Sequence, residues 1–317
     1  MSAMCLDGMP LDSAYHAPVL ASEVISLLRG AHDVLDGTLG GGGHALALLE
    51  SGVDRLVGLD RDPEALSAAA ARLASFANAG RFAAIESNYT EAAELPDLSG
   101  RRFGGVLLDL GISSHQVDDE GRGFTFRRGA PLDMRMGRDA ERGAADLLND
   151  ADEQTLTAIF RGFGDEPKAA RLAREIVRRR ATHAFASSDD LVAAIRAVLG
   201  PRSGAGDFAR LFQAVRIAVN DELSGLARAL PVLRELLVAG GRMVVIAYHS
   251  GEDRLVKHAF REWSAACVCP PRQPICTCRG RPLGETLTRR AITATPVEIE
   301  QNPRARSARL RAWQSAA

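Results

Sequence analysis

The chain has 317 residues, 46% of them hydrophobic, and its 39 Lys and Arg side chains nearly balance 40 Asp and Glu, which gives a formal net charge of -1. This composition excludes collagen-like, disordered and disulfide-scaffold proteins, and the length predicts one large domain or two unequal ones. No apolar run approaches the ~18 residues of a membrane span, and no basic segment followed by an apolar one opens the sequence. We therefore expect a cytoplasmic protein that does not bind membranes.

The first third of the sequence alternates short apolar runs with helical patterns. Each run ends in a polar or glycine turn, and Pro63 stands at a first-turn position of one helical segment. Strands that alternate with helices predict an α/β fold with a parallel, doubly wound sheet. The apolar runs lie at 34–35, 55–59, 81–85 and 105–110.

The middle of the sequence contains no strand-like run, and three amphipathic helical patterns follow one another there. The first is entered by a capping-box spacing from Asp150 to Glu153, and the last begins at Ser187 or Ser188. We therefore expect an all-helical domain inserted into the α/β domain. The predicted domains are a helical insertion for substrate recognition, 115–207, and a discontinuous domain, 1–114 with 208–317.

The α/β pattern returns after the insertion. An unbroken apolar run at 243–248 follows two glycines and is typical of a buried strand. The segments 287–294 and 308–313 are further strand candidates, and we expect them at the edge of the sheet.

A glycine-rich segment from Asp36 to His44 lies where the first strand ends and a helix begins. Glycines let the backbone approach a ligand closely, and the N–H groups of a helix N-terminus favour a negative group. Asp60 ends the next strand, where an acid can bind ribose hydroxyls, and Asp109 ends the fourth strand at the same edge. These features predict a nucleoside-containing cofactor. Because Asp36 precedes the glycines and suits a cationic amino-acid group, S-adenosylmethionine fits better than a dinucleotide.

The ordered motifs of the chain resemble the MraW family of ribosomal RNA small subunit methyltransferases. The resemblance implies a Rossmann-like S-adenosylmethionine-dependent methyltransferase fold with an inserted all-helical domain. It also implies methylation of the N4 amine of a cytosine in the decoding region of 16S rRNA, with the small ribosomal subunit as partner. The matching motifs lie at 15–20, 37–44, 60–63, 108–114 with Gln116, 122–124, 131–136, 212–216, 249–254 and 302–307.

The resemblance also implies roles for individual residues. Tyr89 is expected to flank the adenine of the cofactor and Asp60 to bind its ribose, whereas His44 is expected to position groups and not to act as a base. We expect His249 to organise the turn that follows it by hydrogen bonding, and contact with the target base is the alternative. The cofactor-binding candidates are Gly42, Gly43, His44, Asp60, Tyr89, Asp109 and Gln116. The chemistry of the reaction, apart from the resemblance, requires an acceptor for the N4 proton. The catalytic candidates for this role are Asp109, Ser113 and Asn302, with the backbone carbonyls of the 111–114 turn as an alternative.

The near-zero net charge conceals an asymmetry. After residue 270, the sequence contains nine arginines but only three glutamates and no aspartate. Such a basic end predicts contact with a polyanion, although a solvated surface would give the same pattern. The arginines expected to contact RNA phosphates are Arg304, Arg306, Arg309 and Arg311.

Four cysteines, Cys267, Cys269, Cys276 and Cys278, form two C-x-C pairs separated by six residues. Four thiolates within reach could hold tetrahedral zinc, but the spacing differs from the usual C-x2-C knuckle. We therefore expect reduced thiols and no metal.

The sequence also leaves open two other functions, an NAD-type oxidoreductase and a non-catalytic RNA-binding protein. It does not distinguish a monomer from a dimer.

Overall fold

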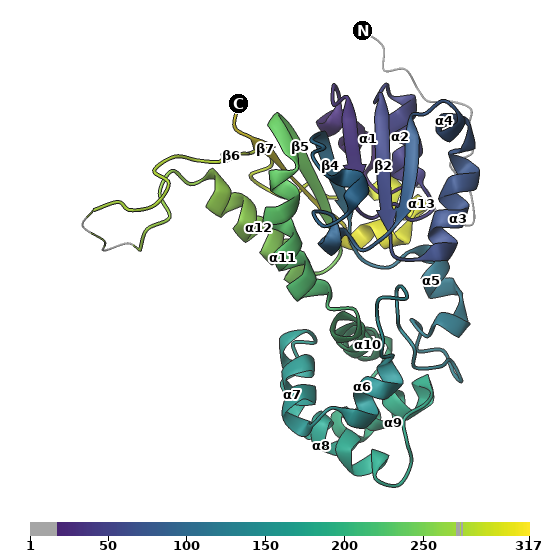
Figure 1. Cartoon of the computed structure of the whole chain (residues 1–317). Helices are drawn as coiled ribbons and strands as arrows, with labels where there is room; N and C mark the ends of the chain where they lie inside the picture. Colours follow the sequence, from purple (N-terminus) through teal and green to yellow (C-terminus); the bar gives the residue numbers. More distant parts are fainter. Residues whose placement is uncertain (1–17, 271–272, 274) are drawn as a thin grey trace. The chain divides into compact units, whose positions relative to one another are not determined.

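The computed structural model describes residues 18–317 except 271, 272 and 274, and it divides into two compact units (Figure 1). The first unit comprises the described residues up to Gly111 and Leu226–Ala317, and the second is Ile112–Gly225. The first part of the N-terminal family motif, residues 15–17, lies outside the described residues. The second unit extends beyond the expected end at residue 207, because a further helix packs on its core.

A seven-stranded sheet forms the centre of the first unit, in the order β3-β2-β1-β4-β5-β7-β6. The first five strands in this order are parallel, and β7 runs antiparallel to both of its neighbours. This mixed sheet is typical of the S-adenosylmethionine-dependent methyltransferase fold, so the predicted fold class is confirmed. The strands are β1 Asp33–Asp36, β2 Arg55–Asp60, β3 Phe82–Glu86, β4 Phe103–Asp109, β5 Leu237–Ala247, β6 Gly284–Thr286 and β7 Arg309–Ser315.

Helices cover both faces of this sheet, because parallel strands are apolar on both sides. On one face, Leu48 and Leu73 belong to a buried cluster with the strand residues Val34 and Leu107. On the other face, Leu230 and Phe260 are buried against a second set of strand residues. The helices of this unit are α1 Ala21–Leu28, α2 Gly43–Glu50, α3 Pro63–Arg72, α4 Ala74–Asn78, α12 Ser250–Ser264, α13 Pro296–Gln301 and, from Leu226, most of α11 Glu222–Glu235.

The C-terminal strand does not lie where the sequence predicted it. β7 lies between β5 and β6, inside the sheet, and its side chains Leu310 and Trp313 are fully buried. The segment 287–294 forms only an isolated bridge, between Ile292 and Leu310, and the edge strand is β6 instead. The expectation of two edge strands was therefore wrong.

The second unit is built from helices around a core of its own. Leu156, Ile176 and Ile195 from three successive helices are buried in it, as their spacing predicted. α10 packs on α7 and α6, which explains why this unit extends to Gly225. The helices are α5 Ser114–Asp118, α6 Ala144–Asp150, α7 Glu153–Gly162, α8 Ala169–Arg180, α9 Ser188–Leu199 and α10 Ala205–Val219.

Caps fix the start of two of these helices. The carboxylate of Asp152, not Asp150, accepts a hydrogen bond from the backbone N–H of Thr155 at 2.7 Å, so the predicted cap of α7 was two residues too early. Ser187 is the N-cap of α9, as one of the two predicted starts, and it forms a capping box with Asp190. Each cap satisfies backbone donors that the first helical turn leaves without partners.

A buried asparagine holds the family motif 131–136 within the second unit. The Asn220 side chain donates to the carbonyl of Met134 at 2.8 Å and accepts from the N–H of Met136 at 2.9 Å. Met134 has a φ of 61°, which is unusual for a residue with a side chain. The two hydrogen bonds therefore stabilise a strained turn.

Among the described residues, no helix combines the length and apolar character needed to cross a bilayer.

Candidate functional site

Three aspartates end three neighbouring strands of the first unit. Asp36, Asp60 and Asp109 are the last residues of β1, β2 and β4, which lie side by side in the order β2-β1-β4. The strands are parallel, so their carboxyl ends meet at one edge of the sheet, where ligands of open α/β folds bind. The structure thus brings together the three acids that the sequence singled out.

The glycine loop between β1 and α2 is fastened to both neighbouring strands. Gly37 N–H donates to the Leu107 carbonyl at 2.9 Å, and Leu39 N–H donates to the Leu59 carbonyl at 2.8 Å. A Cβ atom on Gly37 would lie 2.6 Å from the Cδ2 atom of the buried Leu108, so a larger residue there would require Leu108 to shift. Gly40 has a φ of +52° and open space beyond it, with nothing within 4 Å of a Cβ atom. The loop is rigid where it meets the sheet and leaves room next to Asp60.

Both carboxylate oxygens of Asp60 are oriented by the backbone. One accepts from Gly40 N–H at 2.7 Å, and the other accepts from Asp62 N–H at 2.9 Å. Burial raises the pKa of Asp60, while these N–H groups oppose the rise by stabilising the charged form. The N–H of Arg61 is a third backbone donor to this carboxylate, which can accept about four hydrogen bonds in all. About one acceptor position remains, which suits a hydroxyl such as that of a ribose.

Asp36 and Asp109 make the edge of the sheet strongly acidic. Burial raises the pKa of Asp36 to about 7, and the nearby carboxylates of Asp109 and Asp60 add to the rise, against the opposing effect of His44. Burial likewise raises the pKa of Asp109. Burial disfavours the charged form of a carboxyl group, and a cation beside it stabilises that form. The edge therefore suits a positively charged ligand and disfavours a pyrophosphate.

His44, at the start of α2, is held on both sides of its ring. Nε2 donates to the Val19 carbonyl at 2.9 Å, and Nδ1 lies 3.6 Å from the Asp109 carboxylate. The buried ring thus connects the segment before α1 to the end of β4. This arrangement favours the positioning role that was predicted for His44.

Two residues at this edge were missed by the sequence analysis. The Tyr248 hydroxyl donates to Asp109 Oδ1 at 2.9 Å, and the Asp109 N–H donates to Thr38 Oγ1 at 2.6 Å. Burial and the facing carboxylate of Asp109 raise the pKa of Tyr248 well above its usual value, so the hydroxyl stays a donor. Tyr248 ends an apolar run and was taken as core, but its position directly after β5 was the available signal.

The other predicted cofactor contacts fall in different places. Gly42 and Gly43 start α2, and Tyr89 follows β3, where its Cβ lies 3.1 Å from the position of a Cβ atom on Gly37. Ser113 and Gln116 belong to the second unit and cap each other: Gln116 N–H donates to Ser113 Oγ at 3.2 Å, and Ser113 N–H donates to Gln116 Oε1 at 3.0 Å. The cofactor roles of Gly42, Gly43, Tyr89 and Gln116 stay predictions, as does the catalytic role of Ser113.

Asn302 and His249 both cap helices. Asn302 Oδ1 accepts from Arg304 N–H at 3.2 Å and so caps the short 3-10 helix that follows. His249 Nδ1 accepts from the N–H groups of Gly251 and Glu252 at 3.2 and 3.3 Å, at the start of α12. The structural role expected for His249 is confirmed, whereas a catalytic role for Asn302 stays a prediction.

The four predicted RNA-contacting arginines do not form one exposed group. Arg306 and Arg309 are exposed and Arg304 is half-buried. Arg311 is buried, and its guanidinium donates to both carboxylate oxygens of Asp253 at 2.7 and 3.1 Å. A guanidinium used in this way is not available to a phosphate, so the prediction for Arg311 was wrong.

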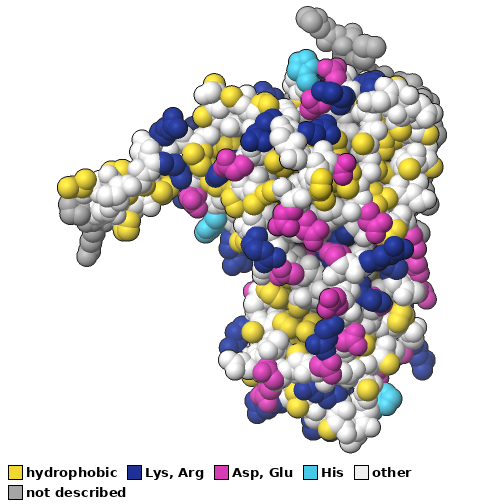
Figure 2. Space-filling view, in the orientation of Figure 1, with side chains coloured by type: hydrophobic (Ala, Val, Ile, Leu, Met, Phe, Trp, Pro, Cys, Tyr) yellow, Lys and Arg dark blue, Asp and Glu magenta, His cyan; other side chains and the backbone are white. Residues whose placement is uncertain are grey.

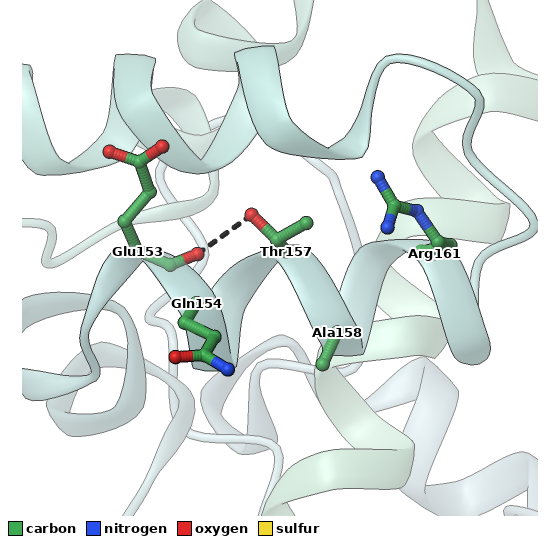
Figure 3. A pocket seen from close by; sticks show the side chains of 5 residues that line it. All are labelled: Glu153, Gln154, Thr157, Ala158 and Arg161. Atoms are coloured by element: carbon green, nitrogen blue, oxygen red, sulfur yellow. Dashed lines mark hydrogen bonds between the residues drawn. The ribbon is translucent and has the colours of Figure 1, made fainter.

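The second unit has a surface hollow whose lining comes from α7 alone (Figure 3). The Thr157 hydroxyl in it donates to the Glu153 carbonyl at 2.7 Å and is thus used within the helix. The remaining lining side chains belong to Glu153, Gln154, Ala158 and Arg161. The half-exposed carboxylate of Glu153 lies 3.5 Å from Arg174, and no second catalytic group lines the hollow beside it, so we assign no site there.

Raising the pH from about 4 to about 7 is expected to lower the free energy of unfolding of the chain. Folded Asp36 keeps its proton up to about pH 7, whereas an unfolded aspartate loses it near pH 3.9. Over this range the unfolded state binds fewer protons than the folded state, so rising pH favours unfolding, by at most about 4 kcal/mol.

Denaturant unfolding at a series of pH values measures this effect. Asp36→Asn is expected to flatten the pH dependence, because the amide does not titrate. Asp54→Asn serves as the control, because the exposed Asp54 has a pKa that is lowered, not raised, by its hydrogen bond with His32. In this variant the free energy of unfolding should still decrease between about pH 4 and about pH 7. A wild-type slope in Asp36→Asn would contradict the raised pKa.

Comparison with known proteins agrees with this geometry. Ribosomal RNA small subunit methyltransferase H of Gemmatimonas aurantiaca is 65% identical over 302 residues, which cover 95% of this chain and 96% of that protein. The protein of the same name from Heliobacterium modesticaldum is 45% identical over 309 residues, covering 94% and 97%. Among solved structures, an rRNA methylase from Streptococcus thermophilus has a TM-score of 0.41 at 9% identity and covers 94% of both chains. A model of the MraW methylase family matches residues 13–316, and the chain belongs to that family.

Proposed function

We propose that the chain transfers a methyl group from S-adenosylmethionine to the N4 amine of a cytosine in the decoding region of 16S rRNA. The observation that carries this proposal is the set of three carboxylates at neighbouring strand ends beside a fastened glycine loop. The names of the relatives support rRNA of the small subunit as the substrate. Membership of a methylase family supports methyl transfer as the reaction.

The residues at this edge fit the proposed cofactor. The open space at Gly40 and the remaining acceptor position of Asp60 suit the ribose. The buried carboxyl of Asp36 suits the ammonium group of the amino-acid part, and Tyr89 suits the flank of the adenine. An NAD-type cofactor would place the negative charges of a pyrophosphate against Asp36 and Asp109, which costs free energy. The acidic edge therefore favours the methyl donor over the dinucleotide.

The contribution of the protein to this reaction is mainly alignment. S-adenosylmethionine, when bound, supplies an electrophilic methyl group on a positively charged sulfur. The N4 lone pair of cytosine is delocalised into the ring, so the chain must orient the amine in line with that methyl group and accept an N4 proton. Asp109 is the first candidate for this acceptor, because a raised pKa makes its carboxylate a better base. Tyr248 and His44 fix its orientation, and Ser113 and Asn302 remain the other candidates.

The substrate must present its target base outside the stack. A cytosine paired or stacked in rRNA cannot reach a methyl group at the edge of the sheet, so we infer that the base is flipped out. We further propose that the helical insertion shapes the RNA site, and that the reaction takes place in the cytoplasm on 16S rRNA or the small subunit. The chain acts there as a monomer or a dimer.

Mass spectrometry of 16S rRNA tests the proposed function. A strain without the gene is expected to lack one N4-methylcytosine, which returns when the wild-type gene is supplied but not when the Asp60→Ala gene is supplied. Labelled S-adenosylmethionine with purified chain, offered naked 16S rRNA or small subunits, identifies the substrate. An RNA-binding chain that transfers no label to either substrate would overturn the proposal, as would a chain that binds NADH and not S-adenosylhomocysteine.

Exposed arginines are expected to contribute to RNA affinity. Replacing Arg306 and Arg309 together with alanine should weaken binding to 16S rRNA and lower its salt dependence by about 0.7 in log–log slope per lost phosphate contact. Arg102→Ala is a matched control, because this exposed arginine directly precedes β4. It therefore lies at the amino ends of the parallel strands, away from the carboxyl ends where the site is. Equal slopes for wild type and the double variant, measured at several salt concentrations, would rule out these contacts.

A further inference from the structure

A loop between α12 and β6 projects from the first unit and carries four cysteines (Figure 1). Among the described residues of this loop, the large apolar side chains lie at the surface and form no core: Val268 is 40% and Ile275 is 75% exposed. Cys267 and Cys276 are exposed, and Cys269 and Cys278 are half-buried. Such a segment needs another source of stability to hold one conformation.

The four sulfur atoms nevertheless form a compact cluster. All four Sγ atoms lie within 4.8 Å of one another. Cys276 Sγ lies 3.8 Å from Cys267, 3.9 Å from Cys269 and 3.5 Å from Cys278, and Cys278 lies 3.8 Å from Cys267. Thiols are weak hydrogen-bond donors and acceptors, so their mutual contacts give little reason for this arrangement.

The spacing of the sulfurs is that of a tetrahedral metal site. Zn–S bonds of about 2.3 Å in a tetrahedron place each pair of sulfurs about 3.8 Å apart. The four measured separations of 3.5 to 3.9 Å cluster around this edge length. The soft thiolate ligands select zinc over the oxygen-binding cations magnesium and calcium.

The surroundings of the cluster also suit thiolates. Val268 N–H points at Cys278 Sγ from 3.4 Å, and a backbone N–H in this position stabilises a negatively charged sulfur. Arg279 directly follows Cys278 and donates to the carbonyls of Arg281 and Ala265 at 3.0 and 3.2 Å, which closes the base of the loop behind α12. Figure 2 shows dark blue side chains where the loop joins the rest of the unit. Positive charge in this part of the unit favours the net charge of about −2 that four thiolates and one Zn²⁺ carry.

We propose that Cys267, Cys269, Cys276 and Cys278 bind one Zn²⁺ ion through four thiolates. Each sulfur loses its proton to solvent and forms one Zn–S bond, with no change of oxidation state. All four ligand positions are protein sulfurs, so the site is structural and has no place for a reactive water. The metal replaces the missing core of the loop and fixes its two C-x-C segments against each other. The sequence analysis expected reduced thiols without metal, because spacing alone does not show that the two pairs converge.

Metal analysis of the full-length chain tests the site. The chain is produced in zinc-containing medium, purified under reducing conditions without chelator, and freed of any histidine tag. Elemental analysis is expected to find one zinc per wild-type chain and none in Cys267→Ser/Cys276→Ser. Cys5→Ser is the matched control, because it removes the fifth cysteine of the chain and is expected to keep the metal.

A second measurement uses only the wild-type chain, so its result does not depend on whether a cysteine variant folds. Zinc is removed from the wild-type chain with a chelator and Co²⁺ is added, which should give the visible absorption of tetrahedral cobalt thiolate. A folded, reduced wild-type chain that holds no zinc and binds neither added Zn²⁺ nor Co²⁺ would overturn the proposal. So would a double cysteine variant that retains its zinc, or a purified chain in which these cysteines form disulfides under reducing conditions.

Discussion

Arg311→Leu is expected to destabilise the first unit by about 3 to 5 kcal/mol. The guanidinium of Arg311 pairs with both oxygens of Asp253, and each side chain is only 10% exposed. Removing the arginine leaves a buried carboxylate beside Arg309, whose Nη1 lies 3.7 Å away and whose side chain is half in solvent. Water and this screened contact cannot replace two charge-assisted hydrogen bonds.

Tryptophan fluorescence during guanidinium unfolding measures this loss in the correct unit. The chain has only two tryptophans, and Trp263 and Trp313 pack edge to face in the first unit, with ring centroids 5.2 Å apart. Arg309→Leu is the matched control and should cost less than about 1 kcal/mol. Arg311→Leu/Asp253→Leu is expected to recover most of the stability, because no uncompensated charge remains. Equal effects of Arg311→Leu and Arg309→Leu would show that the buried pair contributes nothing special.

The same arginine shows where the sequence was insufficient for the fold. The parallel strands were predictable, because their apolar runs and intervening helices are local patterns. β7 lies inside the sheet through its pairing with β5 and β6, and there Arg311 meets Asp253, a partner 58 residues away that no local pattern indicates. The boundary of the second unit was missed for a related reason. The apolar face of α10 suits either domain, and only packing on α6 and α7 decides between them.

The candidate site was predictable in outline and not in detail. Asp36, Asp60 and Asp109 were found because the carboxyl ends of parallel strands share one edge, whatever the packing around them. Tyr248 was missed, since a tyrosine at the end of an apolar run gives no sign of its hydrogen-bond partner. The cysteines were expected to be reduced thiols without metal because their spacing does not follow a common knuckle, and only the sulfur positions show that the two pairs converge.

Asp60→Ala is expected to weaken binding of S-adenosylhomocysteine by at least about 100-fold. Under the proposed function, the remaining acceptor position of the carboxylate binds the ribose, and a hydrogen bond to a charged group contributes about 1.5 to 3 kcal/mol. The variant also frees the N–H groups of Gly40 and Asp62, which loosens the glycine loop next to the cofactor. Both effects act in the same direction, so the loss should exceed that of a single contact.

Isothermal titration with S-adenosylhomocysteine measures this affinity, and thermal unfolding reports whether the variant is folded. Asp54→Ala removes an exposed carboxylate just before β2, at the opposite end of that strand, and is expected to leave the affinity unchanged. Asp62→Ala removes the cap of α3 without touching the proposed ribose contacts, so it should lower stability by about 1 kcal/mol and affinity much less than Asp60→Ala. If a folded Asp60→Ala chain bound with native affinity, the acid at the end of β2 would have no role in holding the ribose. The acidic edge would then act on the cofactor through Asp36 and Asp109 alone.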